Sequence, residues 1–588
     1  MKILGISCFF HDAAAVLIDE GILISAAEEE RFSRVKHDFN FPTNAINFCL
    51  AKANLNSNDI DAVVFFEKPF LKFERILQTS AASFPRTTKL FNQSMRTWLF
   101  DKIWIKSQIK EFLDIDDKKI YFSDHHLSHA SSAYFSSPFQ DSAIVTFDGV
   151  GEWATTTVGS ATNNLINIEK EIRFPHSIGL LYSAFTAFLG FEVNEGEYKV
   201  MGMAPFGNPI FADKVREVVH QFNDGSVWLD NKYFSFHNST DKSYTKKFEK
   251  LFGNPREPEL PFFTENTGYP SYFGDLPTDM KQRITSNQYY ADIAASIQLV
   301  TEELVINLLK QVQKESNSKN LCLAGGVALN SVINGKILEQ TGFNDVFIQP
   351  AAGDSGGALG AALYLYNSES SAKRFVMKHA YWGEEYSDEI IKSTLDRNKL
   401  KYKIYSEEDL VNEISKKLVD QKVIGWFQGR FEWGPRALGN RSILADPRNS
   451  EMKDIVNIKI KFREPFRPFA PSVLEDKADD YFNIPDSSRM LERFMLSVVS
   501  VKEKYSDTIS AVNHLGTARV QTVYEDTNSM YFNLIKSFYN ITGVPMLLNT
   551  SFNVRGEPIV TSPQDAINTF LNSGIDTLVI GRFVIDKT

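Results

Sequence analysis

The chain of 588 residues contains only three cysteines, Cys8, Cys49 and Cys322, which lie far apart. So few cysteines rule out a disulfide framework, and their spacing rules out a zinc site built from cysteine pairs. Such a composition is typical of a reducing compartment, so we expect a cytoplasmic protein.

The sequence also lacks a long apolar run. The longest early apolar stretch, 13–27, is interrupted by Asp19, Glu20 and Gly21. No segment approaches the ~20 apolar residues that span a bilayer. Asp12 follows the first apolar residues at once, so the N-terminal stretch does not form the apolar centre of a signal peptide. We therefore expect no association with a membrane.

The chain also has no excess of positive charge, because its 63 lysines and arginines are outnumbered by 73 aspartates and glutamates, which gives a net charge of −10. Non-specific binding of nucleic acid rests on clustered positive charge, so nucleic acid is not an expected partner. Hydrophobic residues at 43% and charged residues at 23% are typical of a globular protein. The length favours several domains, and the net charge still allows a local basic pocket for a small anion.

The spacing of apolar residues predicts strands and helices, in an order that occurs twice. The first set is expected at 3–7, 13–18 and 22–26, then as a helix from Thr43 and a strand at 62–66. The second is expected at 142–147 and 155–159, then as a helix at 290–314 and strands at 320–323 and 346–348. This order predicts a layered α/β fold. Residues 206–287 lack a regular pattern and predict an irregular insertion with a functional role or a lid.

Two histidines and two aspartates form a candidate metal site. His125 and His129 are four residues apart, so on a helix they share one face and can bind one ion. The alternative is an ordinary helix start, in which Asp124 caps the helix and the histidines are hydrogen-bonded. Asp148 and Asp354 follow other predicted strands, and the carboxyl ends of strands can converge. This ligand set suits Fe(II), Mn(II) or Zn(II).

Three glycine-bearing loops follow predicted strands, at 148–151, 325–330 and 353–357. Glycine lets backbone N–H groups approach a phosphate, and a following helix adds its positive end. One such loop alone is more often a simple turn, but three together predict a nucleotide cleft. None matches the patterns G-x-x-x-x-G-K-[ST] or G-x-G-x-x-G, which excludes the two common nucleotide-binding motifs.

The second half of the chain is rich in basic motifs. The segments 429–442 and 459–468 place basic residues among prolines, glycines and aromatic residues, and Arg519, Ser551 and Arg555 add to the set. A solvated surface would show periodic charge of balanced sign, whereas arginine forks suit phosphate and carboxylate oxygens. Surface arginines around turns are the alternative. The sequence predicts a pocket for a small polyanion.

Taken together, these motifs resemble the O-carbamoyltransferase family that includes the tobramycin and nodulation-factor carbamoyltransferases. The matching stretches run through the chain in family order: 11–14, 28–38 (EEERFSRVKHD), 124–129, 148–153, 196–207 (GEYKVMGMAPFG), 323–330, 353–357, 434–442, 461–471, 519–523 and 548–557 (LNTSFNVRGE). The resemblance implies an N-terminal two-lobed domain of the actin and sugar-kinase type (ASKHA) and a YrdC-like α/β C-terminal domain. With the polar stretch 367–374 as boundary, they are expected at 1–370 and 376–588.

The resemblance implies an enzyme that carbamoylates a hydroxyl group of a sugar or another natural product. Carbamoyl phosphate and ATP would first give carbamoyl-adenylate in the C-terminal domain. The N-terminal domain would then transfer the carbamoyl group to the acceptor and release AMP. The expected cofactor is Fe(II), or another divalent metal such as Mn or Zn, with Mg accompanying ATP.

The resemblance also assigns residues. The metal ligands would be His125, His129, Asp148 and Asp354, and the catalytic residues His11, Lys461 and Arg519. A histidine near neutrality, such as His11, can remove the proton of the acceptor hydroxyl. The expected nucleotide and anion contacts are Lys36, Gly151, Gly325, Gly326, Asn330, Arg436, Lys461, Arg467, Arg519, Asn549 and Ser551.

Two other functions stay open. The tRNA threonylcarbamoyl-transfer enzymes are related through both domain types, although the acidic balance and the lack of a basic stripe weigh against a tRNA partner. The other alternative is a non-catalytic module that senses nucleotide and metal. Such a module would need only one of the two sets of residues, the histidine set of the first domain or the basic set of the second. The acceptor is not identified, because residues 206–287 match no motif, and a homodimer is also left open.

Overall fold

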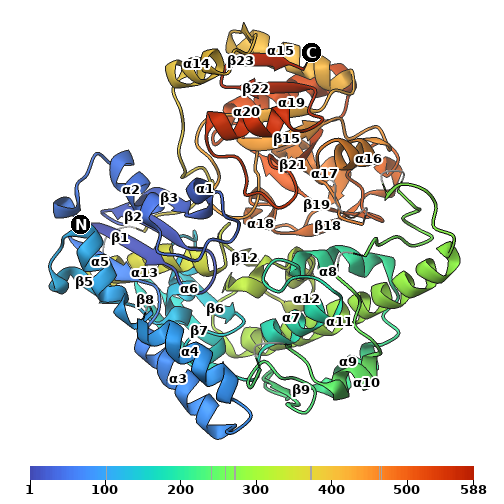
Figure 1. Ribbon diagram of the computed structural model, residues 1–588. Helices are drawn as coiled ribbons and strands as arrows, with labels where there is room; N and C mark the ends of the chain where they lie inside the picture. Colours follow the sequence, from blue (N-terminus) through green and yellow to red (C-terminus); the bar gives the residue numbers. More distant parts are fainter. Residues whose placement is uncertain are drawn as a thin grey trace.

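The first sheet of the computed structural model (Figure 1) joins three antiparallel strands to two parallel ones. Its strands, in the order β3-β2-β1-β4-β5, are β1 (Lys2–Ser7), β2 (Ala14–Asp19), β3 (Ile22–Glu28), β4 (Ala62–Phe65) and β5 (Ile120–Phe122). β2 pairs antiparallel with β1 and β3, whereas β4 runs parallel to β1 and β5. Nearly all side chains of β1, β2 and β4 are buried, as in strands covered on both faces.

The second sheet repeats this arrangement. Its strands, in the order β8-β7-β6-β11-β12, are β6 (Asp141–Phe147), β7 (Ala154–Thr162), β8 (Leu165–Arg173), β11 (Asn320–Ala324) and β12 (Asp345–Phe347). β6, β7 and β8 are antiparallel, and β11 runs parallel to β6 and β12. Two sheets of the same strand order define a duplicated, two-lobed domain. The predicted actin and sugar-kinase type of fold is therefore confirmed.

Helices cover both sheets. Those between β3 and β6 are α1 (Glu30–Ser33), α2 (Thr43–Lys52), α3 (Pro69–Ala82), α4 (Thr88–Phe100), α5 (Ile105–Leu113) and α6 (His125–Tyr134). Those that follow β8 include α7 (Ile178–Phe188), α8 (Glu197–Met203), α11 (Met280–Glu315), α12 (Ser331–Thr341) and α13 (Asp354–Glu369), of which α13 packs against β1 and β2 of the first sheet. No helix in the described part of the chain combines the length and the apolar character that crossing a membrane requires.

The region 206–287 is more ordered than its sequence predicts, so the expectation of an irregular insertion was wrong in part. It contains α9 (Ala212–Val218), β9 (Val219–Gln221), β10 (Val227–Leu229) and α10 (Lys246–Phe252), and α11 begins inside it. These elements have only three to seven residues each, too few to show a period. Aromatic packing holds them, since the ring of Phe248 lies 4.9 Å from that of Phe185 and 5.3 Å from that of Phe188.

The C-terminal part is a second α/β unit, drawn in orange and red above the two lobes in Figure 1. Its eight-stranded sheet has the order β13-β23-β22-β14-β15-β21-β16-β20. The strands are β13 (Lys403–Ile404), β14 (Ile424–Phe427), β15 (Arg441–Ala445), β16 (Ala470–Leu474), β20 (Gln521–Val523), β21 (Met546–Ser551), β22 (Thr577–Ile580) and β23 (Phe583–Asp586). Beside them lie α14 (Asp388–Arg397), α15 (Glu407–Val419), α16 (Met452–Val456), α17 (Ala478–Tyr481), α18 (Met490–Arg493), α19 (Ser529–Thr542), α20 (Pro563–Leu571) and a small sheet of β17 (Phe482–Asn483), β18 (Val498–Val501) and β19 (Thr517–Arg519).

The two units share buried surface. Trp433, Phe466 and Phe494 belong to the C-terminal part of the chain but pack in the apolar core of the first domain. The structure describes residues 1–100, 102–239, 242–258, 260–270, 273–370, 374–461, 464 and 466–587. Three residues of the expected boundary, 371–373, lie outside this set, as do Phe462, Arg463 and Pro465 of the second basic segment. The domain limits 1–370 and 376–588 stay a prediction.

Two glycines let α13 pack closely against β1 and α6. A Cβ atom on Gly5 of β1 would lie 1.9 Å from the carbonyl oxygen of Ala358 in α13. A Cβ atom on Gly360 of α13 would lie 1.7 Å from the carbonyl oxygen of Ser128 in α6. Close backbone approach therefore fixes α6 and α13 relative to each other.

This packing predicts the effect of Gly360→Ala. The added methyl group must separate α6 from α13, so the free energy of unfolding should fall by about 1–3 kcal/mol in thermal or urea denaturation. Gly202→Ala is the matched control, because a Cβ on this helical glycine meets no atom closer than 3.6 Å. The control should be neutral or slightly stabilising. Equal stability of the two variants would contradict the account.

Candidate functional site

The four predicted metal ligands meet between the two lobes. His125 and His129 come from α6, Asp148 follows β6, and Asp354 begins α13. His125 Nε2 lies 2.8 Å from Asp148 Oδ2, and His129 Nε2 lies 3.5 Å from Asp354 Oδ1. One ligand atom from each of the four residues lies within 4.8 Å of the others. We call these four residues the His/Asp cluster.

The His/Asp cluster fits a divalent cation. All four side chains are buried, and the two Nε2 atoms are only 3.1 Å apart. Asp354 Oδ2 and the Nδ1 atoms of both histidines are buried without a hydrogen-bond partner among the described residues. Two buried carboxylates facing two imidazoles can balance the charge of one ion, and this donor set suits Fe(II), Mn(II) or Zn(II).

Polar groups around the cluster orient its histidines. Glu67, which follows β4, has its Oε2 atom 3.7 Å from His125 Nδ1 and accepts a 2.6 Å hydrogen bond from Lys72. His126 points away: its ring nitrogens contact Thr146 Oγ1 at 2.6 Å and the carbonyl oxygen of Ala154 at 2.9 Å. Burial, together with the neighbouring histidines, lowers the pKa of His126 to about 3. His126 therefore has a structural role, whereas the His125 ring points toward Asp148 of the His/Asp cluster. The alternative of a simple Asp124 cap does not hold, since Asp124 makes no side-chain capping hydrogen bond in this helix.

The expected glycine contacts lie at the same place but serve different ends. A Cβ on Gly151 would lie 2.9 Å from the His125 ring, so this glycine leaves room for the ligand. Gly325 has a φ of +91° and lies against the backbone of Phe147, next to Asp148. Gly326 is exposed, and a Cβ there would approach Asp148 Oδ1 at 3.4 Å. Asn330 caps α12 by accepting a hydrogen bond from the N–H of Ile333, which assigns its carbonyl oxygen a local structural role.

His11 lies in the loop between β1 and β2, and its pKa is higher than the near-neutral value that the proposed role of a base favours. Its Nδ1 atom lies 2.8 Å from Asp12 Oδ2, and its Nε2 atom lies 3.2 Å from the carbonyl oxygen of Asn194. Both ring nitrogens thus face oxygen acceptors. Burial lowers the pKa of His11, but Asp12 outweighs burial and the pKa rises to about 9.

Lys36 and His37 belong to the same loop system. Lys36 forms an ion pair with Glu195, and His37 Nδ1 lies 2.8 Å from Asp12 Oδ1. Glu195 and Asn194 precede α8, so this segment of the second lobe reaches across to the loop of His11. In this state Lys36 is held by a carboxylate of the protein.

Three arginines of the basic segment 429–442 divide into two kinds. Arg430 and Arg441 donate to backbone carbonyl groups, for example to those of Gly383 and Gln428. They fit the alternative of arginines that stabilise turns. Arg436 differs, because its guanidinium makes no hydrogen bond or ion pair with any described residue and its Nε atom is buried. Burial lowers the pKa of Arg436 to about 10. A cation so placed is suited to bind an anion.

The other expected anion contacts lie in the same part of the chain and have contacts of their own. Lys461, at the end of a π-helical turn 457–461, donates a 2.8 Å hydrogen bond to Asn553 Oδ1 and also contacts Ser551. Asn549 donates a 3.1 Å hydrogen bond to the carbonyl oxygen of Ala437, beside Arg436. Arg467 donates to Tyr198 Oη at 3.2 Å. Arg519 ends β19, in the small sheet beside the main one.

Tyr198 was not among the residues predicted from the sequence. It lies in α8 of the second lobe, and its ring also faces the guanidinium of Arg467 at 4.8 Å. Tyr198 also acts to raise the pKa of Arg436, against the effect of burial. Its motif, GEYKVMGMAPFG, is one of the stretches that carry the family resemblance. A motif match alone does not reveal that a side chain contacts the other domain.

Glu28 and Arg31 likewise have a role that the sequence did not reveal. Glu28 accepts a 2.8 Å hydrogen bond from the N–H of Gly434, and Arg31 donates at 2.7 Å to the carbonyl oxygen of the same residue. Gly434 has a φ of +101°, and a Cβ there would lie 2.6 Å from the carbonyl oxygen of Pro350. The loop of Arg436 is thereby held directly against the loop that leads to Asp354.

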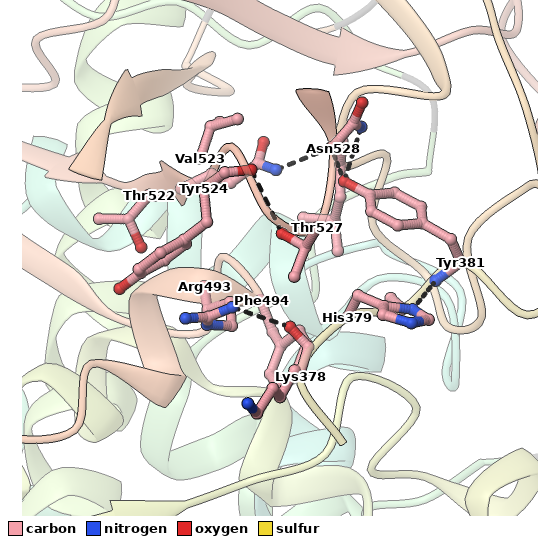
Figure 2. Close-up of a pocket in the computed structure, with 13 residues that line it drawn as sticks. Lys378, His379, Tyr381, Arg493, Phe494, Thr522, Val523, Tyr524, Thr527 and Asn528 are labelled. Carbon is pink, nitrogen blue, oxygen red and sulfur yellow. Dashed lines mark hydrogen bonds between the residues drawn. The ribbon is translucent and has the colours of Figure 1, made fainter. Parts of the chain in front are cut away.

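A cavity lined by residues of the C-terminal part of the chain is too small for a nucleotide. Figure 2 shows His379 and Arg493 among its lining residues, with Arg493 donating to the carbonyl oxygen of Lys378. The cavity volume is about 10 Å³, which is room for about one water molecule. This cavity therefore has no room for ATP.

The fold and these constellations define a class of two-domain proteins, in which an actin-type domain with a buried His/Asp cluster is joined to an α/β domain that carries a buried, unpartnered arginine Nε among its described residues. The chain belongs to the carbamoyltransferase family. The family model described as Carbamoyltransferase N-terminus matches residues 2–363, and the model described as Carbamoyltransferase C-terminus matches residues 415–587. The protein is therefore an enzyme of the carbamoyltransferase type.

Relatives extend over most of the chain. Nodulation protein NolNO of Sinorhizobium fredii is 38% identical, covering 98% of this chain and 79% of its own length. Nodulation protein NolO of Bradyrhizobium diazoefficiens is 39% identical and covers 79% of each chain. The solved structure of full-length HypF in the phosphate- and nucleotide-bound form is 12% identical, with a TM-score of 0.32, over 64% of this chain and 47% of that chain. A likeness this weak says nothing about function, and the fold assignment rests on the strand order.

The geometry predicts which histidines hold a metal ion. Protein carrying His125→Ala and His129→Ala should contain far less divalent metal than the unchanged protein, measured by inductively coupled plasma mass spectrometry after gel filtration. His126→Gln is the matched control, since His126 faces Thr146 and Ala154 instead, and it should retain the metal. Metal retained by the double variant would show that these imidazoles are not ligands.

The contacts of His11 predict its titration. In chelator-treated protein with ¹³C-labelled histidine, NMR should report a pKa near 9, because the Asp12 carboxylate stabilises the imidazolium. Below this pKa the ring is charged, and it becomes neutral as the pH rises through it. Asp12→Asn should lower the pKa by one unit or more. An unchanged pKa in that variant would assign the shift to another group.

Proposed function

We propose that the protein is an O-carbamoyltransferase that uses carbamoyl phosphate and ATP, forms carbamoyl-adenylate, and carbamoylates a hydroxyl group of a sugar or natural product. The observation that carries this proposal is Arg436, a cation with a buried Nε and no partner among the described residues, in the domain matched by the family's C-terminal model. Carbamoyl phosphate is a small dianion that such a group can bind.

In the first step, water cleaves carbamoyl phosphate and releases phosphate, and the oxygen of the resulting carbamate attacks the α-phosphorus of ATP. Pyrophosphate leaves, and carbamoyl-adenylate remains. Arg436, Lys461, Arg467 and Arg519 would stabilise negative charge on the phosphates, with Mg²⁺ accompanying ATP. Lys461 is buried beside Ser551 and Asn553, which fixes the direction of its ammonium group.

In the second step, the acceptor oxygen forms a bond with the carbamoyl carbon, and AMP leaves. His125, His129, Asp148 and Asp354 would hold a divalent ion, which we propose to be Fe(II). When bound, this ion supplies Lewis-acid stabilisation of the nucleotide phosphates. His11 would take the proton of the acceptor hydroxyl, which requires that Nε2 releases Asn194 and that the ring becomes neutral.

The contact at Gly434 supports a direct path between the two steps. Carbamoyl-adenylate is a mixed anhydride, so exposure to water would destroy it. Because Gly434 lies against Pro350, the loops of Arg436 and Asp354 are neighbours. An intermediate formed at Arg436 therefore has a short route to the His/Asp cluster, within what we propose to be a cytoplasmic enzyme.

The first step can be tested without knowing the acceptor. The protein with ATP, carbamoyl phosphate and Mg²⁺ should release pyrophosphate, measured by a coupled phosphate assay with and without pyrophosphatase. Arg436→Gln should lower the rate by about 10²-fold or more, because an uncompensated charge then develops on the phosphates. Arg86→Gln, at an exposed arginine of the first domain, is the control. ATP turnover that does not depend on carbamoyl phosphate would contradict the proposal.

A further inference from the structure

Arg75 is a buried cation that the proposed reaction does not yet use. It lies in α3, and its side chain is 7% exposed. Its Nη1 atom is buried without a hydrogen bond, and no ion pair joins its guanidinium to another described residue. The guanidinium carbon lies 5.1 Å from the centre of the Phe174 ring. Burying a guanidinium without an anion is costly, so this position needs an explanation.

The nearby carboxylates are committed to other donors. Glu67 accepts a 2.6 Å hydrogen bond from Lys72, and Glu152 accepts backbone N–H groups of Lys68 at 2.9 Å and His125 at 3.0 Å. Burial lowers the pKa of Arg75 to about 10 even though both glutamates act to raise it. Neither carboxylate accepts a hydrogen bond from the Arg75 guanidinium among the described residues.

Arg75 lies close to the proposed transfer site. Glu67 acts to raise the pKa of Arg75, and its Oε2 atom lies 3.7 Å from the Nδ1 atom of His125. On the other side, the Lys72 ammonium lies 4.1 Å from the ring of Phe10, the residue before His11. Lys72, three residues before Arg75 and on the same face of α3, donates to Glu67, so this helix face lies next to the neighbour of His125.

The same position adjoins the region 206–287, where the acceptor contacts are expected. Phe174, which faces Arg75, has its ring 6.3 Å from that of Phe236 in this region. Phe10, between Lys72 and His11, is 38% exposed and offers an apolar surface at the same place. A cation next to exposed aromatic surface is suited to a sugar that carries an acidic group.

We propose that Arg75 binds an oxyanion, a carboxylate or a phosphate, carried by the carbamoyl acceptor. The acceptor is then an acidic sugar or a related acidic natural product, and Arg75 selects it. This inference rests on the proposed function, because it identifies the chemical class of the acceptor. Anion binding at Arg75 can nevertheless be measured without turnover.

Crystals of the full chain soaked in selenate test the site directly through the anomalous signal of selenium. We expect selenate within hydrogen-bond distance of Arg75 and of Arg436 in the unchanged protein. Arg75→Gln should lose the first peak and keep the second, and Arg86→Gln should keep both. A filled Arg436 site with no peak at Arg75 would overturn the proposal.

Transfer of label from [¹⁴C]carbamoyl phosphate tests the acceptor class, with methyl glucuronide, glucose 6-phosphate and neutral methyl glucoside as acceptors. We expect kcat/KM for an anionic sugar to exceed that for the neutral one by about 10–100-fold. The better anionic sugar identifies the group as a carboxylate or a phosphate. Arg75→Gln should abolish the preference, and Arg75→Lys should restore part of it. A preference that survives Arg75→Gln would overturn the proposal.

The two proposals fail in different ways. Absence of pyrophosphate release from ATP and carbamoyl phosphate would overturn the proposed function but not the selenate result. Normal pyrophosphate release without selenate at Arg75 would overturn the acceptor assignment alone.

Discussion

The structure depends on bringing two carboxylates and two imidazoles together in a buried space. Asp148 Oδ2 lies 2.8 Å from His125 Nε2 and 3.4 Å from His129 Nε2, and Asp354 completes the group. Such a cluster is costly to bury unless charges are balanced, and a divalent cation balances them. The duplicated sheets make this arrangement possible, because the carboxyl ends of strands from both lobes face one space. The glycine contacts of α13 and the room left by Gly151 serve the same geometry.

Contacts between residues far apart in the sequence hold the second domain against the first. Glu28 and Arg31 bind both backbone polar groups of Gly434, and Tyr198 of the second lobe contacts Arg467. These contacts place the unpartnered Arg436 near the loop of Asp354. The reaction that we propose has two steps and a labile intermediate, and such proximity would favour it.

Much of this architecture is predictable from the sequence, for identifiable reasons. Strands β1, β2 and β3 are apolar runs separated by short connections, and the spacing of His125 and His129 fixes a shared helix face. The short elements in 206–287 escape prediction because they are held by long-range aromatic contacts. The pKa of His11 escapes it because the ring meets Asp12 and, from a distant loop, Asn194. The sequence does not separate Arg436 from Arg430 and Arg441, since only the folded chain shows which arginine lacks a partner.

The most direct test of the central claim is anomalous diffraction from crystals of the protein as isolated, measured at the iron, manganese and zinc absorption edges. The account predicts one peak, about 2.0–2.3 Å from the Nε2 atoms of His125 and His129 and from carboxylate oxygens of Asp148 and Asp354. It would be contradicted by the absence of a peak in crystals where the His125 imidazole remains directly hydrogen-bonded to the Asp148 carboxylate.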